Sequence, residues 1–265
     1  RKEGIMRNLS LKLLIFEIRK MWTVPILIIS GIFTIFGWAG LLLPIIFGAM
    51  KPGGIINELD IAQIISGEFK MLVPLLSIFF GAGIISFDMK NGWLRTLMAR
   101  PVTKAEYVFT KIISATISIF ALLLLMGTLP VLIISMFMSI HITFDIWIIL
   151  AIHILSIFQT MTYIIICIWF SCWLPGFLNI FVLAVWMIVD SISAPIISSF
   201  LWDNNLALII SDFMYPSGFR EAIESIAGRS SFPTENILWG LASLSGFLTL
   251  ALFHFSKIQI DKGGE

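Results

Sequence analysis

Long apolar stretches alternate along the chain with short stretches that hold nearly all of its charge. Six apolar stretches approach or exceed the ~20 helical residues needed to cross about 30 Å of hydrocarbon. Strands of a membrane β-barrel would alternate apolar and polar residues, whereas these stretches are apolar on every side. We therefore expect a single-domain, all-α membrane protein over residues 1–265, with six transmembrane helices. The expected spans are 24–47, 71–87, 112–137, 147–170, 177–199 and 236–255.

The composition agrees with this class. Hydrophobic residues make up 58% of the chain and charged residues 12%, about half the charged share of an ordinary soluble domain. Cys167 and Cys172 have a spacing that fits neither a zinc site nor a disulfide framework, so we expect two small buried side chains. The first apolar run is longer than the core of a signal peptide and follows a charged segment, so no cleaved leader is expected.

The N-terminal segment 5–22 has the pattern of an amphipathic helix. Lys12 and Arg19 recur on one stripe at helical spacing, Glu17 and Lys20 add further charge, and apolar residues lie beside them. Such a helix lies in the membrane interface.

Lys and Arg are distributed unevenly between the two sides of the expected spans. Six crossings place both termini on one side, and that side holds all but four of the 17 Lys and Arg residues. The positive-inside rule makes this side cytoplasmic. The four residues on the other side are Lys51, Lys70, Arg220 and Arg229.

The segment 200–235 would then be extracellular. Within it, apolar residues at helical spacing between Gly218 and Gly228 predict a short amphipathic helix. The alternative is an ordinary surface loop.

The charged insert 88–106 between the second and third spans is the best candidate functional segment. Its apolar residues recur at i, i+1, i+4 and i+5, which predicts a helix with one apolar face beside Arg95 and Arg100. Apolar anchors with peripheral arginines suit docking into a groove of a partner protein. The alternatives are a solvated loop, and arginines that bind lipid phosphates. The apolar residues are Trp93, Leu94, Leu97 and Met98.

This insert resembles the cytoplasmic loop of ABC-2 type transporter permeases. The shared order is an acid at Asp88, Gly92, the run 100–104 (Arg-Pro-Val-Thr-Lys), and Lys111 opening the next span. Asp88, Asn91 and Trp93 stand where the family more often has Glu, Ser and Thr.

The segment 16–20 (Phe-Glu-Ile-Arg-Lys), followed by Pro25, is similar to the amphipathic entry helix of the same family. The six-span layout and the long segment before the last span also agree with the family.

The resemblance implies a transport subunit of an ATP-driven exporter, with 88–106 as the coupling helix. Two cytosolic ATPase subunits and a second permease copy or paralogue would be its protein partners, with membrane lipids around it and no nucleic acid. The implied coupling residues are Asp88, Gly92, Trp93, Leu94, Arg95, Leu97, Met98, Arg100 and Pro101.

The chain itself is not expected to be an enzyme. It contains no Gly-x-x-x-x-Gly-Lys-Ser/Thr phosphate loop, so ATP and magnesium would bind to the separate ATPase, and no cofactor is expected in this chain. An intramembrane enzyme would need a nucleophile with a base, or paired acids, on facing spans, and the spans offer one Asp and scattered histidines.

Within the spans, Asp190 and Gln159 are candidates for a substrate pathway. A charged group such as Asp190 inside a membrane is costly and often functional, whereas the alternative for Gln159 is a hydrogen bond between helices. The rival class is an ATP-independent secondary transporter or channel with Asp190 as the coupling carboxylate. His153 and His254 lack the ligand partners of a metal site and are expected to be packing or interfacial residues. Apolar span surfaces suggest an amphipathic or hydrophobic cargo, such as a peptide antibiotic, drug or lipid.

Overall fold

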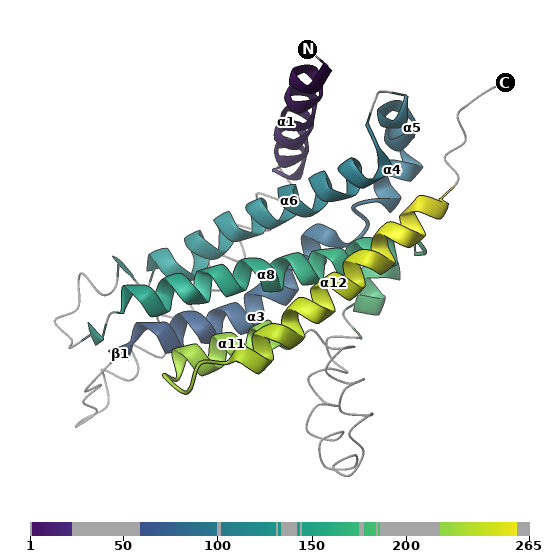
Figure 1. The fold of residues 1–265 in the computed structure, drawn as a ribbon. Coiled ribbons are helices and arrows are strands. Elements are labelled where there is room, and N and C mark those ends of the chain that lie inside the picture. The colour runs from purple at the N-terminus through teal and green to yellow at the C-terminus, as the bar shows by residue number, and fades with distance from the viewer. Residues whose placement is uncertain are drawn as a thin grey trace, which may run out of the picture.

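The structure is a bundle of long helices, and a separate N-terminal helix projects from one side of it (Figure 1). It is a computed structural model that describes residues 2–22, 59–99, 102–130, 132–133, 142–143, 145–174, 178–183, 185 and 218–258. The expected first span, the expected fifth span except 178–183 and 185, and residues 200–217 lie outside the described residues. So do Arg100, Pro101 and Asp190.

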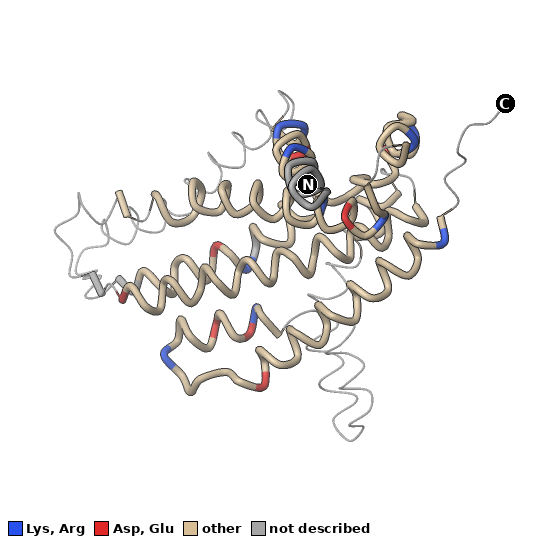
Figure 2. The backbone as a smooth tube through the Cα atoms, turned by 45° about the horizontal axis from the view of Figure 1, so that its top comes forward, with Lys and Arg blue, Asp and Glu red and all other residues tan. Residues whose placement is uncertain are grey.

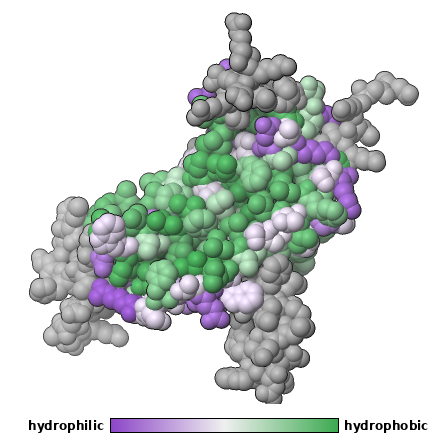
Figure 3. Space-filling model, viewed as in Figure 1, coloured by the Kyte–Doolittle hydropathy of each residue, from purple (hydrophilic) through white to green (hydrophobic). Residues whose placement is uncertain are grey.

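Four helical stretches of the described residues are long and apolar enough to cross a membrane. They are Ile61–Lys90, Lys104–Thr128, Ile146–Ser171 and Thr234–Lys257. Figure 2 shows that these helices carry few charges over most of their length, and Figure 3 shows an apolar surface between more polar regions.

The helices of the described residues are bounded as follows. They are α1 (Lys2–Met21), α3 (Ile61–Gly81), α4 (Ser86–Lys90), α5 (Trp93–Met98), α6 (Lys104–Leu123) with a π-helical turn η1 (Leu124–Thr128), α8 (Ile146–Ser171), α11 (Gly218–Ala227) and α12 (Thr234–Lys257). Two short strands, β1 (Leu59–Asp60) and β2 (Ile142–Thr143), pair in parallel, with Leu59 opposite Ile142.

Local sequence explains where two of the spans begin. Thr103 and Glu106 form a capping box at the start of α6: the Glu106 amide donates to the Thr103 hydroxyl and the Thr103 amide donates to the Glu106 carboxylate. Asp145 caps α8 by accepting from the amides of Trp147 and Ile148. Because of the capping box, α6 begins eight residues before the expected third span at 112.

The second span also begins earlier than expected. The charges of Glu68 and Lys70 suggest a wet loop up to residue 70, yet α3 is helical from Ile61. Lys70 stays on the helix surface, where its Nζ lies 2.9 Å from Glu224 Oε1 on α11. A charge that finds a partner or water need not end a helix.

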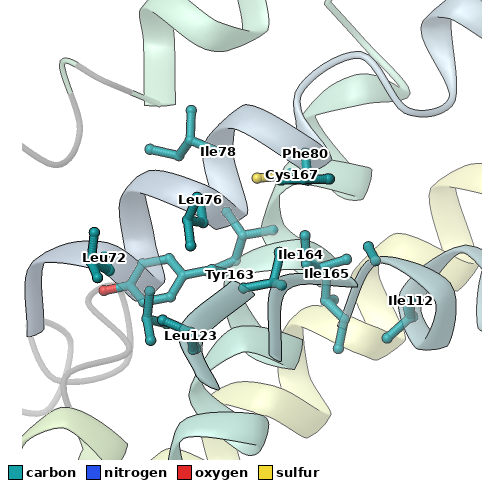
Figure 4. Packing of buried hydrophobic residues seen from close by; sticks show 14 of the residues in the cluster. Leu72, Leu76, Ile78, Phe80, Ile112, Leu123, Tyr163, Ile164, Ile165 and Cys167 are labelled. Carbon is teal, nitrogen blue, oxygen red and sulfur yellow. The ribbon is translucent and has the colours of Figure 1, made fainter. Parts of the chain in front are cut away.

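The core lies where α3, α6 and α8 pack together, as Figure 4 shows for residues such as Leu76, Leu123 and Ile165. At Gly81 the helices approach so closely that an added Cβ would lie 2.6 Å from Cys167 Cβ. Such small-residue contacts let membrane helices pack backbone to backbone. Cys167 is buried and Cys172 is half-buried, and both thiols are free.

The short helix before the last span, α11, packs against α8 and α12. Phe219 stacks on Phe158 of α8, with ring centroids 5.7 Å apart. A Cβ added to Gly240 of α12 would lie 2.9 Å from the Phe219 ring. The apolar face of α11 is therefore buried within this chain.

Candidate functional site: the α4–α5 segment and a buried charge cluster

The charged insert is folded as two short helices and not as one. We call Ser86–Met98, which comprises α4 and α5, the α4–α5 segment. Between the helices, Gly92 has a φ of 69°, a left-handed conformation that costs little for glycine only. The chain then continues into α6 at Lys104.

The sequence predicts that the apolar face of this segment is free to dock into a partner protein. The structure corrects this prediction. Leu94 and Leu97 are 2% and 4% exposed and belong to the core of the chain. Trp93 is half-buried and stacks on Phe16 of α1, with ring centroids 5.1 Å apart. Met98 also packs partly against the core. These side chains anchor the segment to its own subunit, since α5 is too short to be stable unless packed.

The exposed surface of the α4–α5 segment has a different composition. Phe87 and Met89 of α4 are exposed apolar residues, and Lys90 and Arg95 are exposed cations. The sequence pattern predicts no role for Phe87 and Met89, because the predicted apolar face consists of residues 93–98 only. Their neighbours Asp88 and Ile85 are buried, which shows the side of α4 that faces the protein.

Beneath the segment lies a cluster of buried charges, the most unusual feature of the described residues. Glu17 of α1 is 1% exposed, Asp88 of α4 is 2% exposed and Lys111 of α6 is 1% exposed. Lys111 Nζ lies 2.5 Å from Glu17 Oε2 and 2.7 Å from Asp88 Oδ2. Lys20 of α1 forms an ion pair with the other oxygen of Asp88. We call Glu17, Lys20, Asp88, Tyr107 and Lys111 the charge cluster.

Tyr107 of α6 completes this cluster and connects it to α12. Its hydroxyl donates to Asp88 Oδ2 at 2.7 Å, and its ring stacks on Phe255 of α12 with centroids 5.5 Å apart. Lys104 reinforces the same junction by donating to the carbonyls of Ser256 and Ile258 at 2.8 Å each. Elements that are far apart in the sequence are thus joined at one end of the bundle.

The charges within the cluster balance, with two carboxylates facing two lysines. Balance matters because an unpaired ion away from water costs several kcal/mol, whereas a paired ion recovers much of that cost. One carboxylate oxygen, Glu17 Oε1, has no hydrogen-bond partner among the described residues. The ion pairs fix the relative positions of α1, α4 and α6 because each ion needs the others.

The structure also corrects one prediction about the interfacial helix, the position of Glu17. Lys12 and Arg19 of α1 are exposed, and Lys20 lies at the edge with its side chain 39% exposed. Glu17 was expected in the interface but is buried against α6, because it pairs with Lys111. A pairing between residues 94 positions apart leaves no periodic signal in the sequence.

Gln159 lies in the middle of α8 and is 1% exposed. Neither its amide nitrogen nor its amide oxygen has a hydrogen-bond partner among the described residues. Asp190, the other candidate for a substrate pathway, lies outside the described residues, so the structure does not bring the two together.

His153 and His254 have packing partners. His153 is buried, with Nε2 2.7 Å from the Thr128 hydroxyl and Nδ1 2.7 Å from the Ile149 carbonyl. Trp169 donates to His254 Nδ1 at 2.9 Å. Among the described residues, no group of three or more His, Cys, Asp or Glu side chains is placed to hold a metal ion.

A largely helical arrangement, with four apolar helices of spanning length among the described residues, is that of a multi-pass membrane protein. The sequence model of a family described as "ABC-2 family transporter protein" matches residues 17–259. The chain therefore belongs to the ABC-2 transporter family and is a permease, the transmembrane subunit of an ABC transporter. No curated protein matches the chain.

Proposed function

We propose that this permease is the transport subunit of an ATP-driven exporter and that the charge cluster transmits movement from a separate ATPase into the spans. The observation that carries the proposal is the burial of Glu17, Asp88 and Lys111 at the meeting point of α1, α4 and α6. Packed, ion-paired elements move together as rigid bodies. A displacement of α4 is therefore transmitted to α6 through these ion pairs and not through a flexible connection.

The docking surface for the ATPase is the exposed part of the α4–α5 segment. Phe87 and Met89 supply apolar contact, and Lys90 and Arg95 supply positive charge for acidic groups on the partner. The half-buried Trp93 and the buried Leu94 and Leu97 hold the segment in place. Asp88 acts in the same way, as a buried brace. Arg100 and Pro101 follow the segment in the sequence and remain candidates from the family resemblance.

The distribution of Lys and Arg supports a cell-membrane topology with both termini and the α4–α5 segment cytoplasmic. Two ATPase subunits, which bind the ATP and magnesium, and a second permease copy or paralogue would complete the transporter. Apolar span surfaces favour an amphipathic or hydrophobic cargo, such as a peptide antibiotic, drug or lipid. Gln159, whose buried amide has no partner among the described residues, and Asp190 are the candidate cargo contacts.

Association with the ATPase subunit tests the docking surface. Met89→Glu and Arg95→Glu change exposed side chains, so the protein should fold while affinity for the ATPase falls at least tenfold in a co-purification or surface-binding assay. Lys257→Glu is the matched control, an exposed lysine at the same end of the bundle but on α12. Unchanged affinity in both variants would refute this docking surface.

Transport itself is tested by ATP hydrolysis of the reconstituted complex against a panel of peptides, lipids and drugs. Stimulation by one class, with accumulation on the side away from the ATPase, is the expected result. Flux by the purified permease alone, with no need for ATP, would refute ATP-driven export.

A further inference from the structure

The orientation of α1 suggests a second role for this helix. In Figure 1, α1 crosses the direction of the long helices and does not run along them. One side of α1 is fixed to the bundle, where Glu17 and Met21 are buried and Leu13 packs against the core. The opposite side is exposed. A helix perpendicular to the spans lies in the plane of the membrane surface.

Its contacts show which side of α1 faces the lipid. Phe16 stacks on Trp93 of the α4–α5 segment, so this side of α1 faces away from the apolar band of the bundle. Successive residues of a helix are about 100° apart, which places Leu11, Leu14 and Ile18 on the side opposite Phe16. Leu11 is exposed, and Leu14 and Ile18 are half-buried. An uninterrupted apolar side therefore faces the hydrocarbon.

Positive charge flanks this apolar side. Lys12 and Arg19 are seven residues apart, which is about two helical turns, so they lie on one stripe, with the exposed Ile15 beside it. Neither forms an ion pair among the described residues. Glu17, an acid of the same helix, is buried and paired. Two exposed cations at the edge of an apolar face are complementary to anionic lipid phosphates.

We propose that Lys12 and Arg19 bind anionic phospholipids of the adjacent leaflet, and that this contact sets the position of the α4–α5 segment. The link is direct, because Glu17 pairs with Lys111 and Lys20 pairs with Asp88. When α1 settles on an anionic surface, α4 is held with it. The effect on ATP hydrolysis rests on the function proposed above, whereas the lipid contact does not.

The lipid contact is tested by measuring the depth of α1 in nanodiscs of phosphatidylcholine with increasing phosphatidylglycerol. A spin label on Ile15→Cys reports exposure to lipid-soluble and water-soluble relaxation agents. Background labelling is low, because Cys167 is buried and burial raises the pKa of the Cys172 thiol to about 11; Cys172→Ser removes the remainder. The label should move toward the lipid as phosphatidylglycerol increases.

Charge-removing variants separate a specific contact from general attraction. The midpoint of the titration is the phosphatidylglycerol fraction at which half of the change in label depth has occurred. Lys12→Gln and Arg19→Gln should each raise this fraction about fivefold, which corresponds to the loss of one basic residue at an anionic surface. Lys257→Gln, the matched change on α12, should leave it unchanged. An equal shift in Lys257→Gln, or a label depth independent of phosphatidylglycerol, would overturn the proposal.

The link to the ATPase is read from hydrolysis by the complex in the same nanodiscs. Phosphatidylglycerol should raise hydrolysis, and Arg19→Gln should shift that dependence to about fivefold more phosphatidylglycerol while ATPase affinity stays constant. A lipid-dependent depth without any effect on hydrolysis in a competent complex would overturn the link. A lipid-dependent depth in a protein that binds no ATPase would support the contact and contradict the function proposed above.

Discussion

At the scale of single residues, Lys111 is the most constrained cation of the described chain. It lies 1% exposed, between two carboxylates from different helices. In the sequence it is a lysine at the start of an apolar run, part of the family resemblance and of the topology count but with no predicted partner. Its partners come from positions 17 and 88, so only their meeting in space reveals its role.

Lys111→Met should lower the free energy of unfolding by about 3–5 kcal/mol, since it leaves two buried carboxylates without their shared cation. Thermal and chemical unfolding of the purified protein in detergent measure this loss. The control is Lys70→Met, which breaks the exposed pair with Glu224 and should cost at most about 1 kcal/mol.

A second variant separates the loss of the pair from the loss of side-chain packing. Glu17→Gln combined with Lys111→Met leaves one unpaired acid fewer, so the double variant should cost less than the sum of the single variants. Equal costs for Lys111→Met and Lys70→Met would show that the charge cluster does not stabilise the fold.

At the scale of elements, the α4–α5 segment depends on one backbone conformation. Gly92 has a positive φ and open space around its Cα, so an added side chain would suffer from the backbone conformation and not from a clash. Gly67 in α3 also has open space but lies inside a regular helix. The two glycines therefore form a matched pair for a test.

Gly92→Ala should destabilise the protein by about 1–2 kcal/mol, the cost of a left-handed conformation for alanine. Gly67→Ala should stabilise it by about 0.5–1 kcal/mol, because alanine favours a helix over glycine. Unfolding midpoints in detergent provide the comparison. If both substitutions shifted the midpoint in the same direction, the turn between α4 and α5 would not require its left-handed residue.

The boundaries of the helices show which of the expected spans the sequence placed closely. The expected spans 147–170 and 236–255 lie close to α8 (Ile146–Ser171) and α12 (Thr234–Lys257), because nothing charged interrupts the interior of either. The starts of α3 and α6 lie eight to ten residues before the expected ones. Capping by Thr103 and Glu106 was a readable signal for α6, whereas the pairing of Lys70 with α11 was not.

At the scale of the whole molecule, close packing of α3 on α8 holds the bundle together. The contact of Gly81 with Cys167 leaves no room for a Cβ, and the neighbouring Ile164 side chain also lies within 3.1 Å of that position. The distance between two packed membrane helices at their closest point determines which side chains along them are in contact.

Gly81→Ala should therefore force α3 and α8 apart and cost about 1–3 kcal/mol, as overpacking does in other cores. Adding Cys167→Gly removes the obstructing Cβ, so the double variant should be more stable than the two single effects predict. Unfolding in detergent measures both. Strict additivity of the two changes would mean that they do not share a contact.

The amino-acid sequence by itself determined the membrane class, the helical fold and the ABC-2 resemblance, because apolar length and charge spacing act locally along the chain. Tertiary structure alone decided which side of the α4–α5 segment is free: Leu94 and Leu97 turn inward, and Phe87 and Met89 remain outside. It also decided that Glu17, Asp88 and Lys111 form one cluster. Burial and ion pairing depend on residues distant in sequence, and no local pattern encodes which distant residues meet.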